Sequence, residues 1–217
     1  MASDEDSAGH RSAFVHPQGL CESETVGSGT RVWAFAHVLP GAVGGSNCNI
    51  CDGAYVEGGA VVGDRVTVKN QVLLFEGVTV EDDVFLGPAV VFTNDLRPRA
   101  HIKRGGDALL PTLVRQGVTL GAGVIVVCGS TIGANAFVGA GTVVAKNVPA
   151  HAFLVGNPGR RIGWACTCGE RLAEDLICAD CGRHFAPDDR AEALGGLMEI
   201  APAPAANNLS PAGTPAG

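Results

Sequence analysis

Residues 54–92, AYVEGGAVVGDRVTVKNQVLLFEGVTVEDDVFLGPAVVF, place an apolar side chain at every sixth position. The same period extends backward to Phe14, where Gly44 alone breaks it, and it resumes after an interruption. The repeated positions are Phe14, Leu20, Val26, Val32, Val38, Ile50, Val56, Val62, Val68, Leu74, Val80, Leu86, Phe92, Val114, Leu120, Val126, Ile132, Val138 and Val144. A hexad repeat of this kind is the sequence signature of a β-helix, whose stacked coils bury one continuous core.

The other positions of the hexad support the same architecture. The fourth position after the apolar residue is small or β-branched, as in Ala60 and Val66. The position directly after the apolar residue is often glycine, as in Gly63 and Gly87. Glycine tolerates positive φ, which suits a tight corner. A helical period of 3.6 residues does not fit a six-residue repeat rich in Val and Gly. We therefore predict an all-β fold with one short strand per hexad.

The repeat also predicts how the chain is divided. The expected parts are a disordered N-terminus at 1–13, a β-helix at 14–165, a Cys-rich tail at 166–186 and a mostly disordered end at 187–217 with a brief helix near 190–200. Residues 93–113 break the period inside the β-helix. Interruptions of this length in compact domains are usually functional or disordered.

Composition limits the classes of function. The net charge of −7 over 217 residues argues against a nucleic-acid partner. No apolar run reaches the length of a membrane span, and the N-terminal MASDEDSAGHRSA lacks the apolar region of a secretion signal. We expect a cytoplasmic protein that acts on neither nucleic acid nor membranes.

Four of the eight cysteines lie close together in the tail: Cys166, Cys168, Cys178 and Cys181. Without a secretion signal, disulfides are the less expected reading. Four thiolates suit tetrahedral zinc, and a structural zinc would stabilise a segment of about twenty residues that cannot build a core alone. The single residue between the first two cysteines departs from the usual spacing, so four reduced, inert cysteines remain the alternative.

Several motifs resemble the hexapeptide-repeat N-acetyltransferases that act on nucleotide-linked 3-amino sugars. The matching segments are VWAFAHVLPGA at 32–42, KNQVLLFEGVTVEDDVFLGPAVVFTND at 69–95, PRA at 98–100, VCGSTIGANAFVGAGTVVAKNVPAHAFLVGNPGR at 127–160 and IGWACTCG at 162–169. The best match is to the UDP-2-acetamido-3-amino-2,3-dideoxy-glucuronate N-acetyltransferases of O-antigen synthesis, and the dTDP-3-amino-3,6-dideoxyhexose N-acetyltransferases are similar. The VGNPGR ending is shared by many hexapeptide acyltransferases, whereas the segment that ends in FTND is far more specific.

This resemblance implies a single-stranded, left-handed parallel β-helix that assembles as a homotrimer. It also implies an acyltransferase that moves acetyl from acetyl-CoA to the 3-amino group of a UDP- or dTDP-linked sugar in lipopolysaccharide or other surface-polysaccharide biosynthesis. The family's active sites lie between neighbouring subunits, which fits threefold symmetry because three identical interfaces create three identical sites.

Glu76 and Asn94 are the predicted catalytic residues. They lie eighteen residues apart, one turn of a three-hexad coil, so we expect them on the same corner of successive coils. The resemblance implies that Asn94 contacts the amino group of the sugar. Glu76 is expected to accept a hydrogen bond from the amine or to receive its proton. For Glu76, a solvated surface carboxylate is an equal alternative.

Basic residues are the predicted binding groups. Arg99 is expected to pair with a carboxylate or diphosphate through two parallel hydrogen bonds. His37 is a candidate sugar or diphosphate contact, with an ordinary partly buried histidine as the alternative. The resemblance places the phosphates of CoA near Lys146, Arg160 and Arg161, where a solvated end cap is the alternative.

Three other functions compete with this one. An O-acetyltransferase acting on a sugar hydroxyl often relies on a histidine, and the sequence has none between His37 and His101. A γ-type carbonic anhydrase needs three histidines around zinc, and His37, His101 and His151 lack a fitting spacing. A non-catalytic hexapeptide scaffold would not need the long basic interruption.

Overall fold

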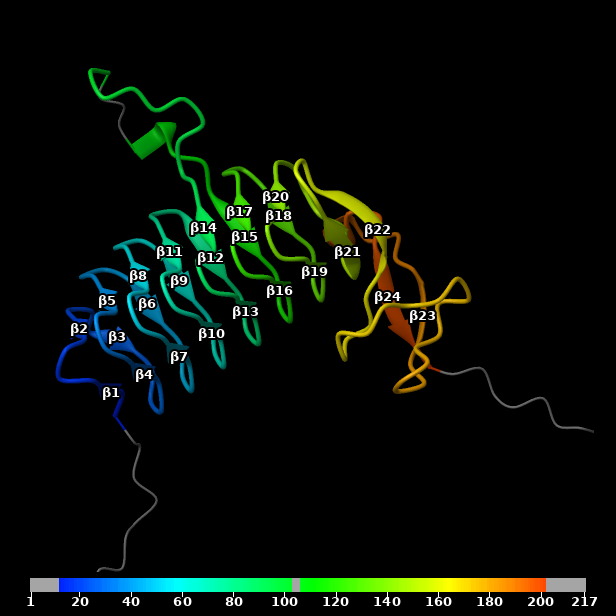
Figure 1. The fold of residues 1–217 in the computed structure, drawn as a ribbon, viewed down its shortest axis with the longest axis horizontal. Coiled ribbons are helices and arrows are strands. Elements are labelled where there is room, and N and C mark those ends of the chain that lie inside the picture. The colour runs from blue at the N-terminus through cyan, green and yellow to red at the C-terminus, as the bar shows by residue number, and fades with distance from the viewer. Residues whose placement is uncertain (1–11, 103–105, 202–217) are drawn as a thin grey trace, which may run out of the picture.

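The computed structural model describes residues 12–102 and 106–201, which form a prism of stacked coils and a small C-terminal unit (Figure 1). Of the segments expected to be disordered, 1–13 and 187–217, residues 1–11 and 202–217 lie outside the described residues, whereas part of 187–201 forms a strand. Each coil gives one short strand to each of three parallel sheets, named here A, B and C. The all-β architecture predicted from the hexads is therefore confirmed.

Sheet A contains β1 (Phe14–Val15), β4 (Arg31–Val32), β7 (Asn49–Ile50), β10 (Thr67–Val68), β13 (Phe85–Leu86), β16 (Thr119–Leu120), β19 (Phe137–Val138), β21 (Ala152–Val155) and β22 (Arg160–Trp164). Sheet B contains β2 (Leu20–Cys21), β5 (His37–Val38), β8 (Tyr55–Val56), β11 (Leu73–Leu74), β14 (Val91–Phe92), β17 (Ile125–Val126) and β20 (Val143–Val144). Sheet C contains β3 (Thr25–Val26), β6 (Val43–Gly44), β9 (Val61–Val62), β12 (Val78–Val80), β15 (Thr112–Val114) and β18 (Thr131–Ile132). The remaining elements are the hairpin strands β23 (His184–Pro187) and β24 (Leu197–Ile200) and the 3-10 turns η1 (Gly106–Ala108) and η2 (Ala191–Ala193).

The strands stack in register from coil to coil. Thr67 pairs with Phe85, eighteen residues later, so three hexads complete one coil. The apolar hexad positions from Val26 onward face inward, and Val68, Leu74 and Leu86 are fully buried. Each such side chain contributes about 1.5–3 kcal/mol when it leaves water, so the repeated aliphatic residues hold the coils together. The prediction is wrong for Phe14 and Leu20, which are exposed, because the first coil pairs one residue out of the period and turns Val15 and Cys21 inward instead.

The glycines that follow the apolar residues have a different role from the predicted one. Positive φ occurs two residues further on, at Arg65 and Ala89, and not at Gly63 or Gly87. A Cβ at Gly87 would lie 2.7 Å from the backbone nitrogen of Ala122 in the next coil. Glycine is needed at these positions because the backbones of successive coils approach too closely for a side chain.

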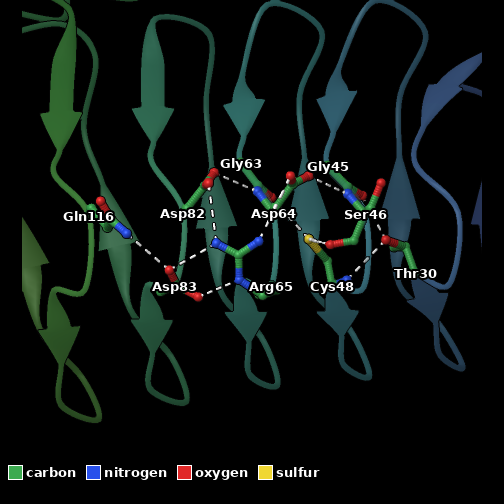
Figure 2. Close-up of polar contacts among 10 residues, drawn as sticks. All are labelled: Thr30, Gly45, Ser46, Cys48, Gly63, Asp64, Arg65, Asp82, Asp83 and Gln116. Carbon is green, nitrogen blue, oxygen red and sulfur yellow. Dashed lines mark hydrogen bonds and ion pairs between the residues drawn. The ribbon is translucent and has the colours of Figure 1, made fainter. Parts of the chain in front are cut away.

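A ladder of polar side chains joins the coils at the corner between sheets C and A (Figure 2). The backbone N–H of Ser46 donates to Asp64 Oδ1 at 2.7 Å, and the N–H of Asp64 donates to Asp82 Oδ1 at 2.9 Å. Arg65 pairs with Asp83 at 2.6 Å, and hydrogen bonding to this guanidinium lowers the pKa of Asp83. We call Ser46, Asp64 and Asp82 the corner ladder.

The interruption of the repeat leaves the prism after β14 and returns at β15. Figure 1 shows it standing away from the coils, and we call its residues 95–109 the arm, of which 103–105 are not described. Val78 still pairs with Thr112, so β12 and β15 are neighbours as if the arm were absent. The arm therefore interrupts the sequence repeat without disturbing the stack.

The chain leaves the prism through the antiparallel hairpin β21–β22 and then forms the C-terminal unit, residues 165–201. The expected helix near 190–200 is absent from these described residues, which form η2 and β24 instead. Pairing of β24 with β23, from Pro187↔Leu197 to His184↔Ile200, accounts for the strand. In the described part of the chain, no helix has the length and apolar character needed to cross a membrane.

Candidate active site

Glu76 and Asn94 lie at the corner where the chain passes from sheet B to sheet C, the B–C corner. The pairing of Leu73 with Val91 places them at equivalent positions of neighbouring coils. At about 4.8 Å per coil, their backbones are one strand spacing apart. The structure thus gives these two residues the relative placement expected from their spacing of eighteen.

Asn94 occupies the point where the arm departs, and its backbone is held in place. Its carbonyl accepts a hydrogen bond from the N–H of Leu110 at 2.9 Å, which closes the base of the arm. The hydroxyl of the preceding Thr93 accepts the N–H of Cys128 in the next coil at 3.0 Å. Because both sides of the base are fixed, the half-buried side chain of Asn94 starts from a defined position.

Glu76 is exposed, and its backbone N–H donates to Glu57 Oε2 at 2.8 Å. Glu57 lies on the same corner one coil earlier, so two carboxylates share the B–C corner with Asn94. Such a pair favours a positively charged ammonium group nearby. Sequence reasoning missed Glu57, although its spacing of nineteen residues from Glu76 was a usable signal.

His37 lies on the outer face of sheet B and does not contact Asn94. Its register runs through Tyr55 and Leu73 to Val91, three coils away, or about 14 Å along the prism at 4.8 Å per coil. The Nε2 atom of His37 is 2.8 Å from Glu22 Oε2. One ring nitrogen of His37 therefore already has a partner, Glu22, in its own chain.

Two aromatic side chains connect His37 to Glu76 along this face. The ring of Tyr55 lies 6.0 Å from that of His37 and 6.1 Å from that of Phe75. Aromatic faces of this kind suit stacking against a planar or ring-shaped ligand. Sequence reasoning missed Tyr55 and Phe75, because outward positions of the hexad carry no periodic signal; the scarcity of aromatic residues, 5% of the chain, was the available hint.

Arg99 is exposed on the arm, as is His101. Within the described residues, the structure forms no contact between Arg99 and either Glu76 or Asn94. The arm to which Arg99 belongs stands away from the coils in Figure 1.

Lys146, Arg160 and Arg161 come together around one cavity. They line a space of about 300 Å³ together with Asn147, Pro149, Leu154 and Gly159. The guanidinium of Arg161 also lies 3.9 Å from the ring centre of Trp164. Continuing the register of Ile125 with Val143 places Lys146 on the B–C corner two coils beyond Asn94, about 10 Å along the prism.

A larger cavity, of about 510 Å³, lies between the prism and the C-terminal unit. Its wall includes His151, which is buried and contacts the carbonyl of Ala165 through Nδ1 at 2.9 Å. Asn135 Nδ2 lies 3.3 Å from His151 Nε2, and burial lowers the pKa of this imidazole. Both ring nitrogens of His151 therefore have partners in its own chain, and none of the predicted site residues lines this cavity.

The four tail cysteines form a separate centre. The Sγ atoms of Cys166, Cys168, Cys178 and Cys181 all lie within 4.8 Å of one another. Cys166 and Cys178 are buried and the other two are exposed. The backbone N–H of Arg183 lowers the pKa of Cys181 to about 6, which favours its thiolate. Among the described residues this is the one cluster with a metal-binding arrangement, and it includes none of the three histidines of the carbonic-anhydrase alternative.

Comparison with known proteins gives a relative and a fold. No family model matches the chain. The dTDP-3-amino-3,6-dideoxy-α-D-galactopyranose 3-N-acetyltransferase of Aneurinibacillus thermoaerophilus is 41% identical over 181 residues, which cover 82% of this chain and 93% of that protein.

Two solved structures are similar in fold. The acetyltransferase domain of PglB from Neisseria gonorrhoeae FA1090, in complex with acetyl coenzyme A, has a TM-score of 0.52 at 18% identity, over 71% of this chain and 60% of that one. A mutant of AntD, an N-acyltransferase from Bacillus cereus, in complex with dTDP and coenzyme A, has a TM-score of 0.51 at 17% identity, over 70% and 80% of the two chains. These likenesses confirm the predicted left-handed parallel β-helix.

Proposed function

Because the chain belongs to the hexapeptide-repeat N-acetyltransferases of nucleotide-linked 3-amino sugars, we propose that it acetylates the 3-amino group of such a sugar with acetyl-CoA as donor. The observation that carries this proposal is 41% identity to a sugar 3-N-acetyltransferase over nearly all of that protein's length. The arrangement of Glu76, Asn94 and the cation-lined cavity along one corner supports it.

The B–C corner offers the groups that the transfer needs. The amine lone pair attacks the thioester carbon, the new N–C bond forms as the C–S bond breaks, and the amine's proton leaves to balance the thiolate. Asn94 Oδ1 can accept an N–H of the amine and so aim its lone pair, a positioning effect of large potential size. Glu76 and Glu57 attract the protonated amine and provide a nearby acceptor for its proton.

The donor fits the C-terminal half of the same corner. Lys146, Arg160 and Arg161 bring three cationic side chains to one cavity, which suits the phosphates of CoA. From this cavity the thioester would extend about two coils to reach Asn94. Acetyl-CoA thus lies along the prism axis rather than across it.

The acceptor fits the N-terminal half. His37, Tyr55 and Phe75 extend up to three coils from Asn94, which suits an extended nucleotide sugar better than a free sugar. Following the relative from Aneurinibacillus thermoaerophilus, the proposed acceptor is a dTDP-linked 3-amino-3,6-dideoxyhexose. Arg99 would pair with its diphosphate. We further propose that the reaction takes place in the cytoplasm and serves the synthesis of a surface polysaccharide.

The proposed assembly is a homotrimer with its sites between subunits. Exposed apolar side chains on the outer faces of the sheets, including Leu20, Val43 and Ile125, provide contact surface. The arm stands away from its own prism, so it can reach the B–C corner of a neighbour and deliver Arg99 there. A site shared in this way would be completed only in the assembled trimer.

The test is an assay of thiol release from acetyl-CoA with a panel of UDP- and dTDP-linked 3-amino sugars. The matched control is the corresponding nucleotide sugar with a 3-hydroxyl group. We expect release and a base-stable amide product with the amine only. Turnover of the hydroxyl compound to a base-labile ester would instead identify an O-acetyltransferase, and no turnover of any compound would leave the scaffold alternative.

The pH dependence separates the two acceptors further. Since no histidine lies on the coils around Asn94, kcat/KM should rise with pH toward the pKa of the substrate amine. The His37→Gln and His101→Gln variants should keep the shape of this profile even if binding weakens. A limb near pH 6.5 that disappears in either variant would identify a histidine base and favour a hydroxyl acceptor.

A further inference from the structure

The four tail cysteines have the spacing of a tetrahedral thiolate site. Their Sγ atoms are 3.5 Å apart for Cys166 and Cys181, 3.6 Å for Cys168 and Cys178, and 3.7 Å for Cys168 and Cys181. Four sulfurs around zinc, each about 2.3 Å from the metal, are about 3.8 Å apart. A disulfide would require about 2.05 Å, so these contacts match a shared metal and not a covalent pair.

The two halves of the cluster have matching backbone geometry despite their different spacing. The N–H of Cys166 donates to the carbonyl of Glu170 at 2.8 Å, and the N–H of Cys178 donates to that of Arg183 at 2.8 Å. In each half the residue after the second cysteine is a glycine with positive φ, 99° at Gly169 and 72° at Gly182. Both segments thus fold back as metal knuckles, and the short first spacing does not prevent this.

The C-terminal unit has too little core to hold itself together. Its buried cluster consists of Cys166, Leu172, Cys178, Phe185 and Leu197. Two of these five residues are themselves cysteines of the site. A segment of this size usually depends on a metal or disulfides for its stability.

This unit closes the end of the prism. The N–H of Ala150, on the last coil, donates to the carbonyl of Ala193 at 3.0 Å, and the N–H of Leu197 donates to the carbonyl of Ala150 at 3.2 Å. The rings of His151 and Phe185 lie 4.9 Å apart across the same boundary. The unit therefore provides partners for backbone groups of the last coil, at the end of the stack that a solenoid must cap.

We propose that Cys166, Cys168, Cys178 and Cys181 bind one structural zinc ion that locks the C-terminal unit onto the last coil as an end cap. The site lies apart from the B–C corner, and the ion takes no part in acetyl transfer. Its contribution is to folding, because binding to the four thiolates stabilises only the closed arrangement of the two knuckles.

The first experiment measures metal in the full chain purified without chelator. We expect one zinc per chain by elemental analysis, loss of that zinc in Cys178→Ser, and full retention in the matched control Cys21→Ser, whose thiol lies in the first coil. Replacement of zinc by Co²⁺ in the wild-type chain should give thiolate charge-transfer and tetrahedral d–d absorption. Less than half an equivalent of zinc, or equal zinc in both variants, overturns the proposal.

The second experiment tests the cap and does not require a variant to fold. Zinc is removed from the wild-type protein with a chelator, and amide hydrogen exchange is followed by mass spectrometry. Exchange should rise at least tenfold in peptides from 150–165 and 184–200 and stay unchanged in 54–92. Equal exchange with and without zinc overturns the capping role. Because acetyl transfer is measured separately, failure here does not bear on the proposed reaction.

Discussion

At the scale of single residues, Asn94 is notable for where its backbone is fixed. It lies between strand β14 and the arm, and its carbonyl accepts a hydrogen bond from Leu110 across the base of that arm. A side chain at the start of a long loop would ordinarily be poorly positioned. Here the hydrogen bond between Leu110 and Asn94 closes the base of the loop and fixes the backbone of Asn94, as a residue that orients a substrate requires.

Asn94→Ala should therefore lower kcat/KM by about 10²-fold, the scale for losing a positioning or oxyanion-type contact. Steady-state assays with the amino sugar measure this loss. The matched control is Asn70→Ala, an exposed asparagine at a different corner of the prism, which should change kcat/KM by less than about twofold. Activity within a few-fold of wild type in Asn94→Ala would contradict the orienting role.

The sequence predicted some residues of the candidate site and missed others, and each outcome has a physical reason. The spacing of Glu76 and Asn94 was decisive because a solenoid converts a separation of eighteen residues into adjacency. Tyr55 and Phe75 were missed because an outward side chain is not constrained by the core. The glycines after the apolar positions, such as Gly63 and Gly87, were recognised but were assigned to positive φ. The period shows that these positions need glycine, but it does not show that the reason is the close backbone of the next coil.

At the scale of elements, the corner ladder joins coils that are otherwise held by two-residue strands. Asp82→Ala removes the acceptor for the N–H of Asp64 and one partner of Arg65. The free energy of unfolding in urea should fall by about 1 kcal/mol, the usual net value of one such hydrogen bond. Asp52→Ala, on an exposed aspartate at another corner, is the control and should cost less than about 0.5 kcal/mol. Equal losses would mean that the ladder adds nothing to coil stacking.

The boundary between the prism and the C-terminal unit should be sensitive to acid through His151. Burial lowers the pKa of this ring below its ordinary value of 6.5, although Glu199 and Asp188 act in the opposite direction. Below pH 6.5 the unfolded chain takes up a proton that the folded ring resists, so stability falls as pH falls. The Tm of the wild type should drop more between pH 7.5 and pH 5.5 than that of His151→Asn, which suits the positive φ of 60° and cannot titrate. Equal drops in Tm for the two proteins would exclude His151 as the cause. Both proteins keep the four tail cysteines, so any loss of metal in acid lowers both Tm values alike and does not affect the comparison.

At the scale of the whole molecule, the sequence was sufficient for the prism and insufficient for its end. A period of six repeated along the coils determines sheets, core and stacking together. The segment 187–201 has no period; its strand pairs with β23, and its turn and strand bond to Ala150. Contacts that depend on one partner elsewhere in the chain leave no local pattern to detect.

The proposed trimer should have three times the 22.0 kDa mass of one chain by light scattering. Sites shared between subunits make a further expectation. Asn94→Ala and Arg99→Ala should each be impaired, but trimers refolded from a mixture should regain activity, because some interfaces then combine a native Asn94 with a native Arg99. A stable monomer, or mixtures no more active than their parents, would contradict the shared site.

The strict register of the coils also makes the prism a ruler. Positions along it come in whole steps of about 4.8 Å, and the distance from Lys146 to Asn94 is two such steps. Inserting one eighteen-residue coil between them would lengthen that distance by one coil spacing, about 4.8 Å, and would leave the side chains around Lys146 and Asn94 unchanged. Adding or removing coils would then change the length of acyl donor that fits between the cation-lined cavity and Asn94, with no change to any residue that touches substrate.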